Sequence, residues 1–268
     1  MKATKTKGSN MRALVTGAGK RLGRAMALAL AEDGYDVAVH YASSEQDAND
    51  VVAQIEARGQ RAVALRADLL RDTETEALLP QAAEALGGDI TCLINNASIF
   101  EPDDLASVTR DSWDRHMQSN LRAPVLLLQA LAAQSLPDLS DEAGEPRAAA
   151  VAINMVDQRV NKLTPDFLSY TLAKSALWTL TQTAAQALAP RIRVNAIGPG
   201  PTLQGPRQSV ADFAAQRRAT PLQRGAGEQD ITSALRYLVG APAITGQLIC
   251  VDGGQHLAWQ TPDALLPE

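Results

Sequence analysis

The residue pair in this sequence with the clearest chemical meaning is a tyrosine and a lysine. Tyr170 and Lys174 are four positions apart in the segment Tyr-Thr-Leu-Ala-Lys, and residues at this spacing share one face of an α-helix. A phenol with a pKa of about 10 is a poor acid–base group at neutral pH, but a neighbouring ammonium favours its phenolate form. Such a pair can pass a proton to a substrate while a hydride arrives from a nicotinamide. Taken alone, the pattern also fits a solvated helix face.

A glycine-rich segment near the start of the chain is a candidate phosphate site. It reads Thr-Gly-Ala-Gly-Lys-Arg-Leu-Gly and contains Gly17, Lys20, Arg21, Leu22 and Gly23. A tight turn directs the N–H groups of a helix start toward a pyrophosphate, and glycine lets the backbone approach it. The spacing departs from G-x-G-x-x-G, because Arg21 stands where a middle glycine is expected. A glycine turn without a ligand is the alternative interpretation.

The end of the second predicted strand indicates which dinucleotide binds. An NAD site usually has an acidic residue there to bind the ribose 2′-OH. Asp36 stands at the start of this strand, so it points away from the cofactor end. The strand ends without an acid, on His40, Tyr41, Ser43 and Ser44. The imidazole, the hydroxyls and the cations Lys20 and Arg21 suit a 2′-phosphate, so we predict NADP(H). The alternative is that the serines only cap the next helix.

These motifs lie in a regular alternation of β-rich and helical segments. Seven short strands are predicted at residues 12–16, 36–40, 62–67, 91–95, 149–155, 193–197 and 247–251. Helices are predicted at 73–86, 111–136 and 230–239 and from about Pro165 onward. Without a hairpin signal, the strands are expected to pair in parallel through βαβ crossovers. The prediction is an α/β fold, a single doubly wound Rossmann domain with a seven-stranded parallel sheet and helices on both faces.

The composition excludes several classes of protein. The 268 residues are 46% hydrophobic and 21% charged, which excludes disorder as the dominant state. The net charge of −5 argues against a nucleic-acid partner. No apolar run approaches the roughly 20 residues that cross a bilayer. Cys92 and Cys250 lie far apart in apolar runs, so a reducing, cytoplasmic setting without a disulfide scaffold is expected. His116 and His256 have no partners at metal-ligand spacing, so no metal is predicted.

The chain ends and the order of the motifs suggest how the chain is organised. Residues 1–10 are rich in Lys, Thr and Gly and are expected to form a flexible arm before one domain at 11–268. Over about Met11 to Trp259 the sequence resembles the short-chain dehydrogenase/reductase superfamily. Beyond the glycine turn and the Tyr/Lys pair, the matching residues are Asp68, Asn95-Asn96-Ala97, Asn120, Pro199-Gly200 and Val251-Asp252-Gly253-Gly254.

The resemblance implies a role for each matching residue. Tyr170 is the proton donor, and Lys174 binds the nicotinamide ribose and lowers the pKa of Tyr170. Asn120 distorts its helix locally and holds a water in a proton relay to Lys174. Asp68 lies beside the adenine. Besides the glycine turn and the end of strand two, the implied cofactor contacts are Asp68, Leu69, Asn96, Ala97, Ser98, Tyr170, Lys174, Pro199 and Gly200.

One departure from the superfamily pattern points to a particular branch. The superfamily usually has a serine thirteen residues before the tyrosine, and this chain has Asp157 there. With Arg21 and Phe100, this resembles the pteridine reductases. An aromatic ring such as Phe100 can cover a flat pterin opposite the nicotinamide. Desolvation is expected to raise the pKa of Asp157, and the positive charge of Lys174 is expected to oppose that rise. The implied substrate contacts are Arg21, Ser98, Phe100, Asp157 and Tyr170.

Three functions therefore stay open at this stage. The first is NADPH-dependent reduction of a dihydropterin or dihydrofolate, the second is ketone reduction in the same superfamily, and the third is nucleotide binding without turnover. Structural alternatives also exist for the branch residues: Phe100 could pack within its loop, Asp157 could cap a turn, and Arg21 could pair with a surface carboxylate. The resemblance further implies a homo-oligomer, a homotetramer or dimer built on residues 120–136 and 165–188. The loop at 202–221 is expected to close over the substrate.

Overall fold

Seven parallel strands form the centre of the molecule. The computed structural model describes residues 11–205 and 207–260, so the arm predicted at 1–10 lies outside the described residues. The strands are β1 (Arg12–Val15), β2 (Asp36–Tyr41), β3 (Ala62–Arg66), β4 (Cys92–Asn95), β7 (Ala150–Met155), β8 (Ile192–Pro199) and β9 (Leu248–Val251). They pair in the order β3-β2-β1-β4-β7-β8-β9, every pair parallel. The strand order reverses between β1 and β4, where such sheets bind ligands.

Alternating side chains on the strands supply two apolar cores, one on each face of the sheet. In β1, Ala13 and Val15 join one core and Leu14 joins the other, and β4 divides in the same way between Ile94 and Leu93. All of these side chains are fully buried. Successive residues of a strand point to opposite faces, so a strand covered on both sides must be apolar throughout. This explains the short continuous apolar runs in the sequence.

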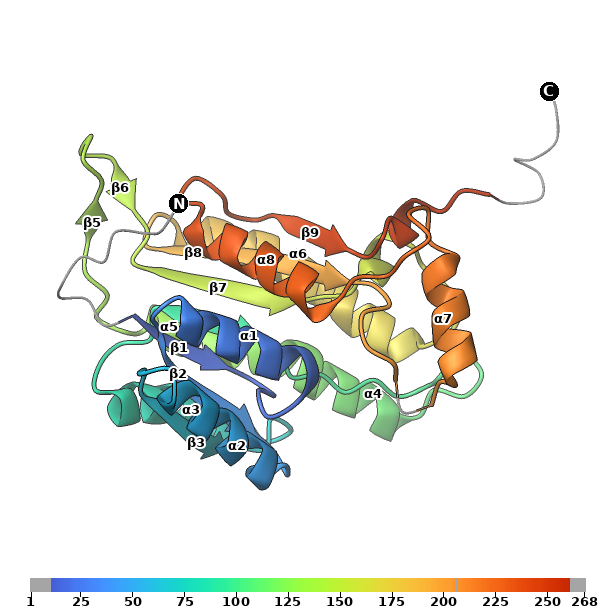
Figure 1. Cartoon of the computed structure of the whole chain (residues 1–268), viewed down its shortest axis with the longest axis horizontal. Coiled ribbons are helices and arrows are strands. Elements are labelled where there is room, and N and C mark those ends of the chain that lie inside the picture. Colours follow the sequence, from blue (N-terminus) through green and yellow to red (C-terminus); the bar gives the residue numbers. More distant parts are fainter. Residues whose placement is uncertain (1–10, 206, 261–268) are drawn as a thin grey trace.

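Helices cover both faces of the sheet, as predicted (Figure 1). One layer consists of α1 (Arg21–Glu32), α2 (Glu45–Glu56) and α8 (Glu228–Gly240). The other consists of α3 (Asp72–Leu86), α5 (Ala123–Ala132) and α6 (Leu168–Leu188). The strand arrows point toward the side where α4 (Arg110–Met117) and α7 (Val210–Arg218) lie. The loops that follow the strands, and with them the predicted site, therefore gather at that edge.

The structure differs from the predicted elements in four places. The helix expected at 111–136 is α4 and α5 joined by a π-helical segment, η1 (Gln118–Arg122). The helix expected from Pro165 begins at Leu168, after the 3-10 turn η2 (Gln158–Asn161).

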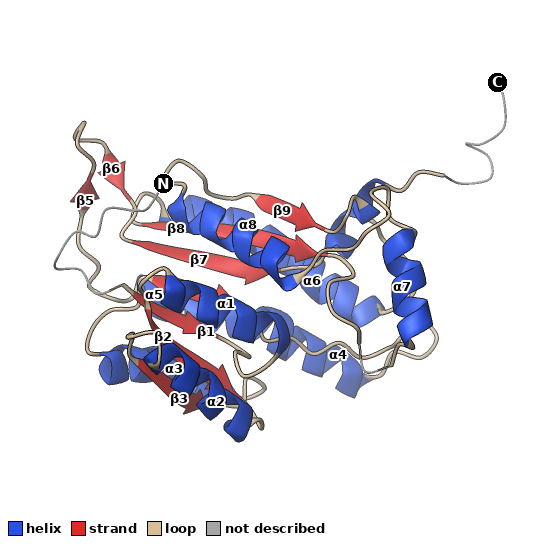
Figure 2. Cartoon of the chain, viewed as in Figure 1, coloured by secondary structure: helices blue, strands red, loops and turns tan. Residues whose placement is uncertain are grey.

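The other two differences are elements that the sequence analysis did not predict. The polar loop at 137–147 forms a small antiparallel hairpin, β5 (Leu139–Ser140) with β6 (Pro146–Arg147), which stands away from the main sheet (Figure 2). Helix α7 lies inside the loop expected at 202–221 and has no buried residue, so it lacks the apolar stripe that would predict it. A short 3-10 turn, η3 (Gln255–Leu257), follows β9. Within the described ranges, none of the helices has both the length and the hydropathy of a membrane span.

Candidate active site

The glycine turn between β1 and α1 is fixed by contacts that leave no room for side chains. Gly17 has φ +62°, a conformation that favours glycine. A Cβ on Gly23 would lie 2.2 Å from the carbonyl oxygen of Gly17 and 2.6 Å from Asn96 Nδ2. Asn96 Nδ2 itself donates to the carbonyl of Thr16 (2.8 Å). The Thr16 hydroxyl, which the sequence analysis did not single out, accepts N–H bonds from Asn96 (2.8 Å) and Ala97 (2.9 Å).

The turn ends at a helix start that can receive an anion. Lys20 is the N-cap residue of α1 and makes no side-chain cap bond, so the first N–H groups of the helix can bind a pyrophosphate. The carboxylate Asp36 points away from this site, because it binds Arg61 at the opposite end of β2 (2.8 Å). The structure thus fits a dinucleotide at the predicted position.

Arg21 occupies an unusual backbone conformation at this turn. Its φ is +52°, which costs a non-glycine residue energy and requires support from its surroundings. The guanidinium donates to the carbonyl oxygens of Gln204 (2.8 Å) and Leu203 (3.1 Å). Arg21 therefore joins the glycine turn to the loop after β8, and among residues 11–205 and 207–260 it pairs with no carboxylate.

His40 does not bind a 2′-phosphate through its ring, and this part of the prediction is wrong. The side chain is 1% exposed. Its Nδ1 accepts the N–H of Gly17 (3.0 Å), and its Nε2 lies 3.0 Å from the carbonyl of Ala67. Burial lowers its pKa to about 4, so the ring is neutral and both nitrogens are used within the protein. His40 instead holds the glycine turn in place.

The other residues predicted to meet the 2′-phosphate lie at the same edge. Ser43 is exposed and Ser44 is the N-cap residue of α2 but makes no side-chain cap bond, so its hydroxyl is not committed to the helix. Lys20 forms an exposed ion pair with Asp47 (2.9 Å). Tyr41 is largely buried. The serines and Lys20 can therefore still turn toward a ligand.

The predicted adenine and nicotinamide ends of the site follow β3 and β8. Asp68 accepts the N–H of Leu70 (3.0 Å), while Leu69 is buried. At the other end, Pro199 is the last residue of β8, and a Cβ on Gly200 would lie 2.5 Å from the Cβ of Asp252. Gly200 is therefore required for the close approach of the β8 and β9 loops. The contacts of these residues with the cofactor stay predictions.

The predicted acid–base residues meet at the carboxyl end of β7. The Tyr170 hydroxyl donates to Asp157 Oδ2 (2.9 Å), and Lys174 Nζ donates to the carbonyl of Met155 (2.7 Å). Lys174 Nζ lies 5.7 Å from the centre of the Tyr170 ring. Asp157 also accepts the N–H of Arg159 (2.8 Å) as the cap of η2. Asp157 therefore both caps a turn and binds the phenol.

Removal from water dominates the charge states of this trio. Desolvation raises the pKa of Asp157. The hydrogen bonds from Arg159 and Tyr170 oppose that rise, and so does the charge of Lys174, as predicted. Burial lowers the pKa of Lys174 to about 8. Burial and the Asp157 carboxylate hold the pKa of Tyr170 well above its ordinary value. The phenol faces a carboxylate and the ammonium is turned to the carbonyl of Met155, so the lowering of the Tyr170 pKa by Lys174 stays a prediction.

Asn120 distorts its helix as predicted. It lies in the π-helical segment η1 and is 1% exposed. Its Nδ2 donates to the carbonyl of Ile99 and its Oδ1 accepts the N–H of Ile99, both at 2.9 Å. Both ends of the amide are thus used to fix the loop after β4. The water relay to Lys174 stays a prediction.

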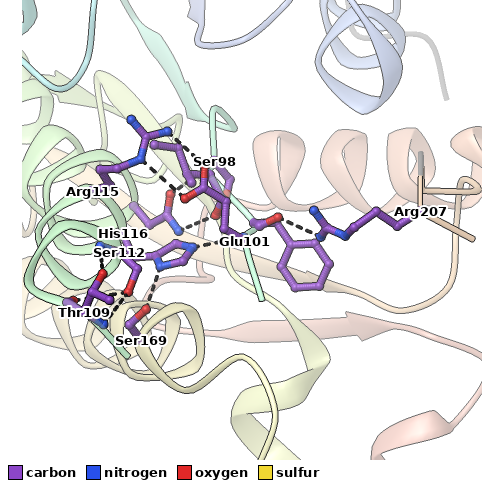
Figure 3. A network of polar contacts seen from close by, with 11 residues as sticks. Ser98, Glu101, Thr109, Ser112, Arg115, His116, Ser169 and Arg207 are labelled. Carbon is purple, nitrogen blue, oxygen red and sulfur yellow. Dashed lines mark hydrogen bonds and ion pairs between the residues drawn. The ribbon is translucent and has the colours of Figure 1, made fainter. Parts of the chain in front are cut away.

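Aromatic rings gather above Tyr170. Phe100 stacks on Phe167 with ring centres 4.3 Å apart and meets the Tyr170 ring edge-on at 4.7 Å. Arg207, which the sequence analysis did not single out, donates to the carbonyl of Phe100 (2.9 Å) (Figure 3). Phe167 covers one face of the Phe100 ring, and the Arg207 guanidinium also lies over this ring, 5.5 Å from its centre. The Ser98 hydroxyl donates to the carbonyl of Ile99 (3.3 Å), and its proximity to the phenol lowers the pKa of Tyr170, against the larger effect of burial.

The fold and the glycine turn define the class of protein: a doubly wound α/β protein with a dinucleotide site at the strand-order reversal. The family described as "Enoyl-(Acyl carrier protein) reductase" matches residues 17–256. The chain is 32% identical over 253 residues to the 3-oxoacyl-[acyl-carrier-protein] reductase FabG of Staphylococcus epidermidis, covering 92% of this chain and all of that protein. The chain therefore belongs to the short-chain dehydrogenase/reductase superfamily, a family of oxidoreductases.

Solved structures show the same similarity. The FolM alternative dihydrofolate reductase 1 of Brucella canis, complexed with NADP, has a TM-score of 0.88 and 43% identity, covering 95% of this chain and 97% of that one. A short-chain dehydrogenase of Burkholderia cenocepacia, also in complex with NADP, has a TM-score of 0.82 and 32% identity, covering 91% and 97%.

The packing of the glycine turn leads to a first prediction. Gly23→Ala places a methyl group against the backbone of Gly17, so we expect the free energy of unfolding to fall by about 3 kcal/mol, the upper end of overpacking costs. Urea unfolding measures this change. The matched control is Gly240→Ala, because a Cβ at the end of α8 meets nothing within 4 Å and should be neutral or stabilise by up to about 1 kcal/mol. Equal effects of the two substitutions would contradict the packing argument.

The buried His40 gives a pH-dependent stability. Below pH 6.5 the imidazole of the unfolded chain takes up a proton, while that of the folded chain stays neutral down to about pH 4. The unfolded state then binds more protons, so stability falls as the pH falls through this window, by about 3 kcal/mol in total. Urea unfolding of the parent and of His40→Gln between pH 7 and pH 4 measures the difference. A slope that is the same in both proteins would show that His40 does not cause it.

Proposed function

We propose that this chain is an NADPH-dependent reductase of a pteridine, such as a dihydropterin or a dihydrofolate. The observation that carries the proposal is the hydrogen bond from Tyr170 to Asp157 (2.9 Å), in the position where the superfamily usually has a serine. Phe100 lies edge-on to the same phenol. The similarity to a FolM alternative dihydrofolate reductase over 95% of the chain supports the same substrate class.

NADP(H) is the cofactor that the site fits best. The glycine turn and the start of α1 would hold its pyrophosphate, and Ser43, Ser44 and Lys20 would bind its 2′-phosphate. The end of β2 has no acidic side chain to repel that phosphate, and two similar solved structures carry NADP. When bound, NADPH supplies a hydride.

The residues of this chain supply the proton and the electrostatic environment. Because its pKa is raised, Tyr170 is protonated at neutral pH and can donate to the substrate nitrogen as the C=N carbon receives hydride. Asp157 orients the phenol; after Tyr170 has given up its proton, Asp157 can take up a proton from solvent and pass it to the phenolate. Lys174, with its pKa near neutrality at about 8, stabilises the phenolate that forms. The predicted cytoplasmic location and the homo-oligomer stay predictions.

A ketone reductase is the second candidate. Two observations favour it: similarity to 3-oxoacyl-[acyl-carrier-protein] reductases over their whole length, and a Tyr/Lys pair that can protonate a carbonyl oxygen as readily as a nitrogen. The presence of Asp157 and Phe100 favours the pteridine.

An NADPH-oxidation assay decides between the candidates. We expect turnover with dihydrobiopterin, dihydromonapterin or dihydrofolate and little with a panel of ketones. Tyr170→Phe, which keeps the ring and removes the proton, should lower kcat by about 10²- to 10⁴-fold. Turnover confined to ketones would rule out a pteridine as the substrate and would support the ketone reductase. No turnover at all, with NADPH still bound, would favour a binding protein.

The raised pKa of Asp157 predicts the shape of the pH–rate profile. The ionised carboxylate is the stronger acceptor of the Tyr170 hydrogen bond, so kcat/KM should fall as the pH drops through the raised pKa of Asp157. Asp157→Ser cannot titrate, and its acid limb should move to lower pH or vanish. Profiles of parent and variant that superimpose would exclude a proton-transfer role for Asp157.

A further inference from the structure

A buried chain of polar side chains lies directly behind Tyr170 and has no part in the chemistry described above. Ser169 donates its hydroxyl proton to the Asp103 carboxylate through a short hydrogen bond. His116 Nδ1 lies 2.6 Å from the same hydroxyl oxygen, and the N–H of Glu101 points to His116 Nε2 (3.2 Å) (Figure 3). Ser169 and His116 are fully buried and Asp103 is 7% exposed.

The donors and acceptors of this chain can be arranged in only one way. The single hydroxyl proton of Ser169 goes to Asp103, so His116 must carry its proton on Nδ1 and donate it to Ser169. His116 Nε2 is then the acceptor for Glu101. The arrangement requires an ionised Asp103 and a neutral His116.

The surroundings favour those two charge states. Burial alone would raise the pKa of Asp103, but hydrogen bonds from Ser169 and Ser112 bring it below its ordinary value. Burial lowers the pKa of His116, and the charge of Arg115 acts in the same direction. The charges of Asp103 and Glu101 oppose this effect. The Tyr170 ring also faces His116, edge-on at 6.0 Å. At neutral pH the chain is therefore in a single state. It is no hydrolytic triad, because the serine proton points to the carboxylate and away from the histidine.

Asp103 also caps the helix that carries the acid–base pair. The N-cap residue of α6, Phe167, has φ +58° and makes no side-chain cap bond. Instead, Asp103 Oδ1 accepts the N–H of Ser169 and the carbonyl of Asp103 accepts the N–H of Leu168, both at 3.1 Å. The first donors of α6 are thus satisfied by a different segment of the chain, and a carboxylate at a helix N-terminus is favourable.

That segment is the loop after β4, which also contains Ser98 and Phe100. Glu101, one residue beyond Phe100, is bound to His116 through its N–H and to Arg115 through its carboxylate (2.9 Å). These contacts therefore join the loop that carries Phe100 to the start of α6, which carries Tyr170. We propose that Asp103, Ser169 and His116 are positioning residues that hold Phe100 and Ser98 in register with Tyr170. This rests on the role of Tyr170 proposed above.

Ser169→Ala tests this inference, and the chain offers a matched control. The Thr171 hydroxyl lies on the other side of Tyr170 in the same helix turn, and its oxygen is buried without a hydrogen-bond partner. Ser169→Ala should lower kcat/KM by about tenfold, with a higher KM for the reducible substrate, because a small misplacement of reacting groups is costly. Thr171→Val should stay within about twofold of the parent. The dissociation constant of NADPH should not change in either variant.

A double-mutant cycle with Asp103→Asn tests whether the residues act as one unit. If they do, the double variant should lose no more activity than the more damaging single variant, because residues of one network are not additive. His116→Gln replaces Asp103→Asn in the cycle if the latter does not fold. Additive losses would overturn the proposal. So would a Ser169→Ala enzyme with a lower melting temperature but the kcat and KM of the parent, since that result shows a structural role only.

The assay uses whichever substrate the parent turns over, with Tyr170→Phe measured beside the other variants. A parent without turnover, or a fully active Tyr170→Phe, overturns the proposed function and this inference together. An inactive Tyr170→Phe beside a normal Ser169→Ala overturns the positioning role alone.

Discussion

A carboxylate, a phenol and an ammonium share a space largely removed from water, and the rest of the site depends on how they compensate one another. Tyr170 and Lys174 are 6% and 2% exposed, and burying unpaired charges is costly. The site meets that cost locally: the phenol binds Asp157 and the ammonium binds the carbonyl of Met155. Both acceptors come from the end of β7, so the exact length of this strand and the start of α6 decide whether the trio forms.

The cofactor end of the site is also held in place by a few side-chain contacts. One hydroxyl, that of Thr16, accepts two backbone N–H groups from the loop after β4, and one imidazole, that of His40, joins the glycine turn to the loop after β3. The ends of the four strands β1, β2, β3 and β4 are thus tied to one another by these two side chains before any ligand is considered. A dinucleotide that binds here meets a turn whose shape is already set, which reduces the entropy lost on binding.

The sequence predicts most of this fold and less of the site. Buried parallel strands are continuous apolar runs, so all seven strands and their parallel pairing through crossovers could be recognised from residue types. Phe167 and Asp103 could not, because each acts through a contact with a segment distant in the chain: a stacked ring for one and a helix cap for the other. The phosphate contact predicted for the ring of His40 was wrong for the same reason. Its place at a strand end indicated a phosphate, and only the packing around it shows that both nitrogens are used inside the protein.

The strained residues of the chain show where that packing matters most. Among residues 11–205 and 207–260, three non-glycine residues have positive φ: Arg21, Phe167 and Gln223. Each is held by contacts from its surroundings: the Arg21 guanidinium binds two carbonyls of the β8 loop, Phe167 stacks on Phe100, and Gln223 donates its N–H to Thr220 (2.7 Å). Such conformations persist only where neighbouring contacts determine them. The acid–base pair Tyr170 and Lys174 lies within the regular helix α6, whereas Arg21 and Phe167 lie where loops meet helix starts, in the kind of segment in which binding residues are commonly found.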